Sequence, residues 1–154
     1  MRNLNPEYIK AVQKSVNGCP YFSLLSMEIL DLKWGESLIE IPAQEKHLQP
    51  FGIVHGGVFA SLLDAAAFWA VYSEVSEDLG MTTVELKINY LAPLSTGRMI
   101  AGGKSLRVGK TICLGEASIV NGQGILLAHG TSTMMILKDL KIQGAEHWPS
   151  KYSD

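Results

Sequence analysis

One acidic residue, Asp64, lies in a long apolar segment that begins directly after His55, Gly56 and Gly57. An isolated carboxylate is costly to bury, and nothing near it in the sequence neutralises it, so we expect it to have a partner or a chemical role. Eight positions separate Gly56 from Asp64 (64 − 56 = 8). They span about two helical turns at roughly 3.6 residues per turn. The pattern predicts a helix whose first N–H groups and whose acid face one ligand.

The residue types in this segment suit attack on a carbonyl group. A carboxylate can act as a general base for water or as a nucleophile. The first N–H groups of a helix are unpaired and lie at its positive end, so they can stabilise an oxyanion. The alternative is a solvated or purely structural acid. A solvated helix face is disfavoured because the sequence neighbours of Asp64 are apolar. They are Leu62, Leu63, Ala65, Ala66 and Ala67.

Other candidate residues each have a second interpretation. His55 could orient Asp64 as a neutral imidazole or only cap the helix, and Gln49 could contact a ligand or only bond its own loop. Gly56 and Gly57 suit a bare backbone beside a ligand but also a plain turn. Four aromatic residues could line a ligand pocket or belong to the core: Phe51, Phe68, Trp69 and Tyr72. Two cations flank a turn, which by itself is typical of a solvated hairpin; the residues are Arg107, Gly109 and Lys110.

Capping, periodicity and turn signals predict the elements that position these residues. A first helix is expected over residues 5–17 and an apolar central helix over 57–74. Strands are expected over 27–34, 37–41, 82–91, 98–106, 111–120 and 125–137. Alternation in the strand 82–91 places Val84, Leu86, Ile88 and Tyr90 on one face and Thr83 on the other. Short connections after the central helix predict antiparallel pairing and an α+β fold, and we expect the tail after residue 137 to be loosely packed.

Composition limits the classes of function. The 154 residues fit one domain, expected to span 1–154. The formal net charge is −2 without a basic block, so nucleic acid is not an expected partner. Cys19, Cys113 and the four histidines lack metal-ligand spacing, so no metal is expected. We find no signal peptide, and the apolar stretch from Val58 to Tyr72 is too short to span a bilayer, so we expect a cytoplasmic protein without membrane contact.

The run Gln49-Pro50-Phe51-Gly52, followed by His55-Gly56-Gly57 and Asp64, resembles the motif of the hotdog-fold acyl-CoA thioesterases. The similarity is closest to the phenylacetate-degradation and hydroxybenzoyl-CoA types and covers about residues 20–137. It implies a sheet of about six strands wrapped around one central helix, and hydrolysis of an acyl-CoA thioester. It further implies that the Gly56 N–H polarises the thioester carbonyl and that Asp64 is the base or nucleophile. Gln49 and His55 would support the thioester end of the site, and Thr83 would help to place the water.

Gly57 is expected to bind the substrate, and the four aromatic residues could line an acyl pocket. The resemblance implies that the basic turn from Arg107 to Lys110 lies near the CoA phosphates. No cofactor is expected, because CoA is part of the substrate. An open sheet edge and a low charged fraction of 18 % predict a homodimer or a dimer of dimers, with Gly56 from one chain and Asp64 from the other. Three alternatives remain open: an acyl-CoA dehydratase or hydratase, a non-catalytic acyl-CoA sensor, and a structural oligomer module.

Overall fold

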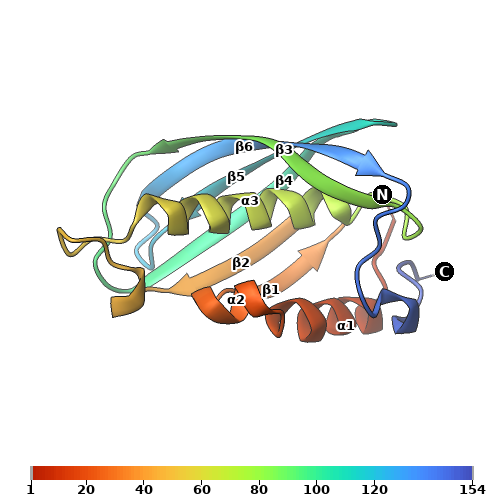
Figure 1. Cartoon of the computed structure of the whole chain (residues 1–154), viewed down its shortest axis with the longest axis horizontal. Helices are drawn as coiled ribbons and strands as arrows, with labels where there is room; N and C mark the ends of the chain where they lie inside the picture. The colour runs from red at the N-terminus through yellow and green to blue at the C-terminus, as the bar shows by residue number, and fades with distance from the viewer. Residues whose placement is uncertain (1, 154) are drawn as a thin grey trace.

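The computed structural model describes residues 2–153 of the chain. One long helix, α3 (Gly56–Tyr72), packs against a six-stranded antiparallel sheet that curves around it (Figure 1). The strands lie in the order β1-β2-β4-β5-β6-β3. Their bounds are Glu28–Lys33 (β1), Glu36–Pro42 (β2), Gly80–Tyr90 (β3), Arg98–Val108 (β4), Ile112–Val120 (β5) and Leu126–Leu137 (β6). This arrangement confirms the predicted α+β fold with one central helix.

Small residues let α3 approach the sheet closely. Gly103 on β4 lies against the helix backbone, since a Cβ at this position would come within 2.0 Å of the Ala66 carbonyl oxygen. Gly115 on β5 is similar, because its Cβ would lie 2.9 Å from the carbonyl oxygen of Ala67. Both alanines are fully buried. Glycine on two central strands therefore sets the distance between helix and sheet, and α3 is buried along most of its length.

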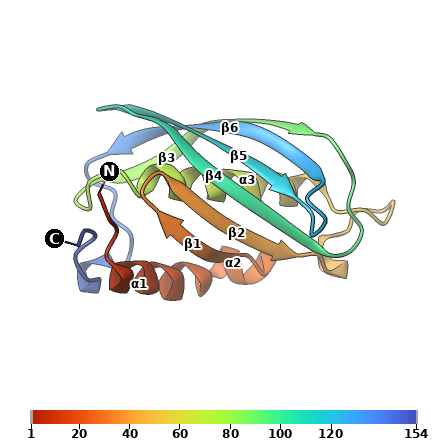
Figure 2. The same cartoon turned by 180° about the vertical axis from the view of Figure 1, so that it is seen from behind.

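A second layer of helix covers the β1 edge of the sheet (Figure 2). It consists of α1 (Pro6–Asn17) and α2 (Pro20–Leu25). The Asn17 side chain accepts a hydrogen bond from the Ile29 N–H at 2.8 Å, and Gln13 donates to the Leu30 carbonyl at 2.9 Å. These bonds satisfy the outer backbone groups of β1, which would otherwise form an open edge. At the other end of the sheet, β3 has only β6 as a strand partner among the described residues.

A bulge in β3 changes which of its side chains face the helix. The pairing with β6 sets Thr83 opposite Met134 and then Glu85 opposite Thr133, so Val84 is an extra residue. Val84 is 52 % exposed, whereas Thr83 turns toward α3. The prediction from strict alternation, which grouped Val84 with the inward residues and Thr83 with the outward ones, is therefore wrong at this point.

Most of residues 138–150 are exposed, but residues 148–152 pack against α1 and the end of α3, so the expectation of a loosely packed tail is wrong for this last part. This segment pairs with residues close to the N-terminus. The Lys151 side chain is fully buried, and its Nζ donates to the carbonyl oxygens of Tyr72 and Val75. The Nζ also lies 4.5 Å from the centroid of the Tyr72 ring. Burial lowers the pKa of Lys151 to about 8, although the Glu77 carboxylate opposes that shift.

The short helical elements were not predicted. The first helix ends at residue 17, as the Asn17-Gly18 signal predicts, but α2 follows after only two residues, with Pro20 at its first position. Two 3₁₀ turns, Glu45–His47 and Ala145–His147, complete the elements. None of the helices in the part of the chain that the structure describes is long and apolar enough to cross a membrane.

Candidate functional site

Two hydroxyl groups fix the Asp64 carboxylate in the middle of α3. Thr83 Oγ1 on β3 donates to Asp64 Oδ1 at 2.9 Å, and Ser132 Oγ on β6 donates to the same oxygen at 2.8 Å. The other oxygen, Oδ2, receives no hydrogen bond from residues 2–153. The carboxylate is therefore anchored through one oxygen and has the other available to accept a proton or to attack a substrate.

Ser132 is the residue of this cluster that the sequence analysis missed. It is fully buried, and it lies on the inward face of β6 with Gly130 and Met134. The available signal was strand parity, because a serine on a buried face needs a hydrogen-bond partner. The resemblance implied that Thr83 places the water, and its contact with Asp64 was not predicted. The bulge at Val84 turns the Thr83 hydroxyl toward the helix.

At the start of α3, His55 acts as the N-terminal cap. Its Nδ1 accepts a hydrogen bond from the Gly57 N–H at 2.8 Å, so in this contact Nδ1 carries no proton. The imidazole is exposed. The cap uses the N–H of Gly57, whereas the N–H of Gly56, at the first helical position, has no acceptor among the described residues. The backbone donor at Gly56 is thus free for a ligand, whereas the one at Gly57 is not.

A pocket of about 330 Å³ lies in front of Gly56 and includes Gln49 in its lining. Tyr90, which the sequence analysis did not single out as a site residue, also lines it, and its hydroxyl donates to the Gly56 carbonyl at 3.1 Å. The Gln49 Oε1 accepts from the Phe51 N–H and so holds its own loop. Phe51 itself is 90 % exposed at the loop tip. Within one chain, Phe51 is therefore outside any acyl pocket.

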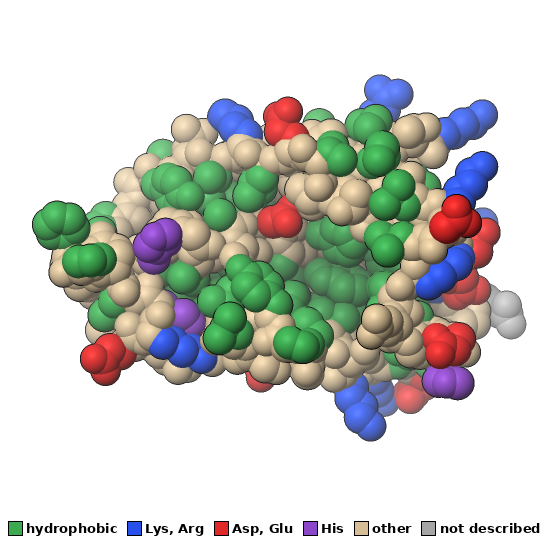
Figure 3. Space-filling view, viewed as in Figure 1, with side chains coloured by type: hydrophobic (Ala, Val, Ile, Leu, Met, Phe, Trp, Pro, Cys, Tyr) green, Lys and Arg blue, Asp and Glu red, His purple; other side chains and the backbone are tan. Residues whose placement is uncertain are grey.

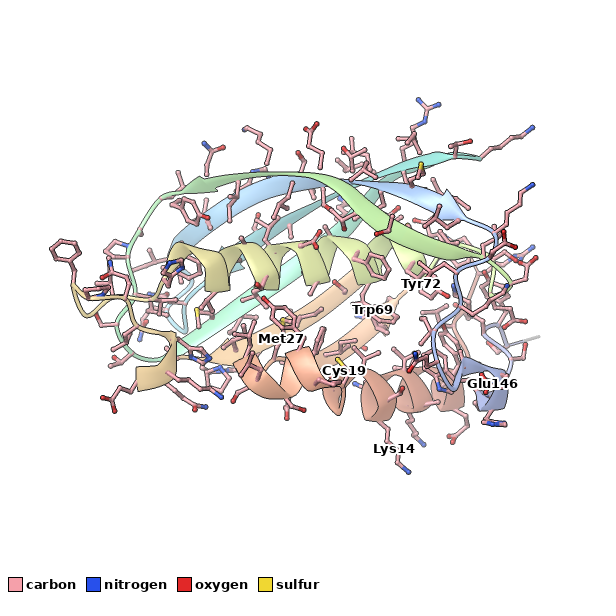
Figure 4. All side chains as sticks on the ribbon, viewed as in Figure 1. Lys14, Cys19, Met27, Trp69, Tyr72 and Glu146 are labelled. Carbon is pink, nitrogen blue, oxygen red and sulfur yellow. The ribbon has the colours of Figure 1, made fainter. Side chains whose placement is uncertain are left out.

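Asp64 opens into a second pocket, of about 390 Å³, between α3 and α2. Its walls are mostly apolar and include Phe22, Met27, Phe68, Trp69 and Leu86. Figure 3 shows that this face of the molecule is hollowed, with hydrophobic side chains on the floor. Figure 4 shows Met27 and Trp69 in the space between α3 and the layer formed by α1 and α2.

The predicted aromatic residues of α3 divide between this pocket and the end of the helix. The rings of Phe68 and Tyr72 stack with centroids 5.7 Å apart, and Trp69 meets both of them edge-on. Phe68 and Trp69 line the pocket of Asp64. Tyr72 instead lies at the end of α3, where its hydroxyl donates to the Leu79 carbonyl at 3.3 Å and its ring contacts Lys151. Burial raises the pKa of Tyr72.

Gly56 and Asp64 line different pockets of the chain. Their eight-residue separation corresponds to about 12 Å along the helix axis, at a rise of about 1.5 Å per residue. A single thioester group is too small to contact both positions in one chain. The structure therefore does not bring the predicted oxyanion donor and the predicted base of one chain onto the same ligand atom.

The predicted basic turn lies far from the start of α3. Both cartoon views place the turn between β4 and β5 at the end of the molecule opposite the beginning of α3 (Figures 1 and 2). Arg107 and Lys110 are exposed, and Gly109 closes the turn through a hydrogen bond from its N–H to the Ile112 carbonyl at 3.1 Å. Within residues 2–153, no group of three or more His, Cys, Asp or Glu side chains has the arrangement of a metal site.

Comparison of the sequence with known proteins identifies the family to which the chain belongs. Residues 51–128 match the family model described as the Thioesterase superfamily. A Saccharolobus solfataricus protein whose name proposes an esterase is 32 % identical over 76 % of this chain and 83 % of its own length. The 1,4-dihydroxy-2-naphthoyl-CoA hydrolase of Listeria monocytogenes is 27 % identical over 76 % of this chain and 95 % of that enzyme.

A solved structure supports the same assignment at the level of the fold. The thioesterase from Haemophilus influenzae superposes with a TM-score of 0.82 and 20 % identity, and the match covers 93 % of this chain and 99 % of that one. The matched segment of the family model includes the free N–H of Gly56 and the anchored carboxylate of Asp64. The chain therefore belongs to the thioesterase superfamily and has its hotdog fold.

Proposed function

We propose that this protein hydrolyses an acyl-CoA thioester to the free acid and CoA. The observation that carries the proposal is the Asp64 carboxylate, which two hydroxyls hold by one oxygen while it opens into an apolar pocket. Family membership supports thioester hydrolysis in general, and the Listeria relative is named for a CoA thioester substrate. An apolar pocket beside a poised carboxylate suits an acyl group whose carboxyl carbon is the reacting atom.

In the proposed reaction, Asp64 Oδ2 accepts a proton from water while the water oxygen bonds to the thioester carbon. The carbonyl oxygen becomes an oxyanion, which the Gly56 N–H stabilises. When the oxyanion collapses, the C–S bond breaks, and the CoA thiolate leaves and is protonated. In the alternative route, the Asp64 carboxylate attacks the carbon itself, the C–S bond breaks, and CoA leaves as a thiolate that is then protonated. Water hydrolyses the resulting anhydride to the free acid and regenerates the Asp64 carboxylate. Both routes use the same two groups, and neither needs an electron acceptor.

We further propose that the two groups of one site come from two chains. The separation of about 12 Å along α3 argues against a site within one chain. A two-fold partner that runs antiparallel would bring its Gly56 near the Asp64 of the first chain. The β3 edge supports such pairing, because its outer side lacks a strand partner among the described residues. It also carries exposed apolar side chains such as Val84 and Tyr90.

The experiment that tests the function is release of free thiol from a panel of acyl-CoAs with straight-chain and aryl acyl groups. The wild type should release thiol from at least one of them. Asp64→Asn keeps the size of the side chain and should lower kcat about a hundredfold or more, the scale of losing a positioned base. Asp139→Asn removes an exposed acid elsewhere on the chain and is the matched control.

Retention of most of the wild-type rate by the Asp64→Asn variant would refute the proposal, provided that its melting temperature is unchanged. A change in enoyl-thioester absorbance without thiol release would instead support a dehydratase or hydratase. Binding of an acyl-CoA without either reaction would support a sensor.

A further inference from the structure

The pocket of Asp64 has one polar feature that the hydrolytic chemistry does not use. Tyr21 on α2 and Ser61 on α3 both line this pocket, and their hydroxyl oxygens lie 2.6 Å apart. Ser61 Oγ also lies 2.9 Å from the carbonyl oxygen of Gly57, one turn earlier in α3. The two hydroxyls therefore form a short row of hydrogen bonds that runs from Tyr21 through Ser61 to the Gly57 carbonyl, on an otherwise apolar wall.

The number of protons available fixes the donor and the acceptor in each of these two hydrogen bonds. A carbonyl oxygen can only accept, so the single hydroxyl proton of Ser61 is directed to Gly57. The bond between Ser61 and Tyr21 must then use the proton of Tyr21. The Tyr21 oxygen keeps a lone pair but has no proton left to donate. Toward the pocket, Tyr21 is therefore a hydrogen-bond acceptor only.

The acceptor lies at a useful distance from the reacting group. Ser61 and Asp64 are three residues apart on α3, so they are neighbours on one helix face, with Cβ atoms about 5–6 Å apart. The flat side chains of Phe22, Phe68 and Trp69 complete the walls around them. Tyr21 is 52 % exposed, so a ligand in the pocket can reach its ring and oxygen.

We propose that Tyr21 is a specificity-determining residue that selects acyl groups carrying a hydrogen-bond donor, such as a hydroxyl or an amino group, over groups that can only accept. The inference rests on the proposed function for the identity of the ligand as an acyl-CoA. Its physical basis is that a donor on the ligand gains a bond to Tyr21, whereas an ether oxygen in the same place meets another lone pair.

Binding is measured with the Asp64→Asn variant, so that the result does not depend on hydrolysis. The probes are benzoyl-CoA and its derivatives with hydroxyl, amino or methoxy at each ring position. At one ring position, the hydroxyl and amino derivatives should bind about fivefold more tightly than the methoxy derivative. Adding Tyr21→Phe should abolish this preference. Equal affinities at every ring position, or a preference that survives Tyr21→Phe, would overturn the proposal.

Ser61→Ala supplies a second, sharper test. Without Ser61 to accept its proton, Tyr21 becomes free to donate as well as accept, so the methoxy derivative should gain affinity relative to the hydroxyl derivative. A residue with only a structural role would not change the order of the probes in this way. An unaltered order in the Ser61→Ala variant would contradict the proposed proton direction. Failure of the wild type to release thiol would contradict the proposed function and leave these binding ratios interpretable.

Discussion

At its last turn, α3 is covered by the C-terminal segment of the chain, whereas at its first turn it faces an open pocket. The carbonyl oxygens at the covered end receive the buried ammonium group of Lys151. At the open end, His55 caps the N–H of Gly57, and the N–H of Gly56 has no acceptor within residues 2–153. The two ends lie about 25 Å apart for a helix of 17 residues.

The covered end of α3 contributes to the stability of the fold, whereas the open end provides a group for the reaction. A cation at the carbonyl end of a helix satisfies buried acceptors and interacts favourably with the helix dipole. An unpaired donor at the N–H end is a loss for stability unless water or a ligand pairs with it. We therefore expect changes at Gly56 to affect turnover and changes at Lys151 to affect folding.

The largest effect is expected at the open end, from removal of the Gly56 N–H. Gly56→Pro deletes the donor at the first helical position, where proline is well tolerated. It should lower kcat about a hundredfold, the usual scale of one oxyanion donor. Gly56→Ala is the control, because it keeps the N–H while its Cβ would lie 3.1 Å from the ring of Tyr90. Equal rates for the proline and alanine variants would show that this N–H is not used.

The covered end should respond in the opposite way. Lys151→Met leaves the carbonyls of Tyr72 and Val75 without their donor, so it should lower the free energy of unfolding by about 2 kcal/mol at pH 9.5. It should leave kcat of the folded enzyme within about twofold, because Lys151 lines neither pocket and contacts only the outer ring, Tyr72, of the aromatic cluster. Chemical denaturation and initial rates measure the two quantities. Loss of turnover in Lys151→Met at unchanged stability would contradict the purely stabilising role of this end of α3.

The pH dependence of this variant sharpens the same comparison. The pKa of Lys151 is lowered to about 8 in the folded chain, from an ordinary value of 10.5. Between these values the unfolded chain binds more protons, so the stability of the wild type relative to Lys151→Met should rise with pH. The slope is up to about 1.4 kcal/mol per pH unit for one proton. Below pH 8, where the lysine is charged in both states, the difference should be constant. A difference that falls between pH 8 and 10.5 would contradict this environment.

The smallest effect is expected at the basic turn, which is remote from the open end of α3. Replacing both Arg107 and Lys110 with Ala should raise KM for an acyl-CoA about threefold and leave kcat unchanged, because phosphate contacts are equal in the ground and transition states. The effect should shrink as salt rises. A short acyl thioester without the nucleotide serves as the control substrate. An unchanged KM would identify the turn as a solvated hairpin.

The central helix and the sheet could be predicted because their signals are local. A cap at His55, a long apolar run and alternating strands with turn residues each indicate one element. The place of Asp64 on the helix follows from the same run. The contact of Asp64 with Ser132 could not be predicted, because it depends on the register of β6, and the Thr83 contact depends on a one-residue bulge in β3.

Two other features were hidden for different physical reasons. The helix that carries Tyr21 has six residues, which is too short to show a helical period. The burial of Lys151 contradicts what its residue type and its place near the chain end suggest, and only the carbonyls at the end of α3 explain it. Features that depend on tertiary partners of a single side chain lie beyond what a sequence pattern indicates.

A hybrid dimer of two inactive chains tests most directly the claim that Gly56 and Asp64 act together across two subunits. One chain carries Gly56→Pro and the other carries Asp64→Asn, and two affinity tags allow the hybrid to be purified. In the shared-site arrangement, one of its two sites combines an intact Gly56 with an intact Asp64, so the hybrid should recover about half of the wild-type rate. A hybrid no more active than either parent dimer, or an active enzyme that sediments at 16.8 kDa, would contradict the shared site.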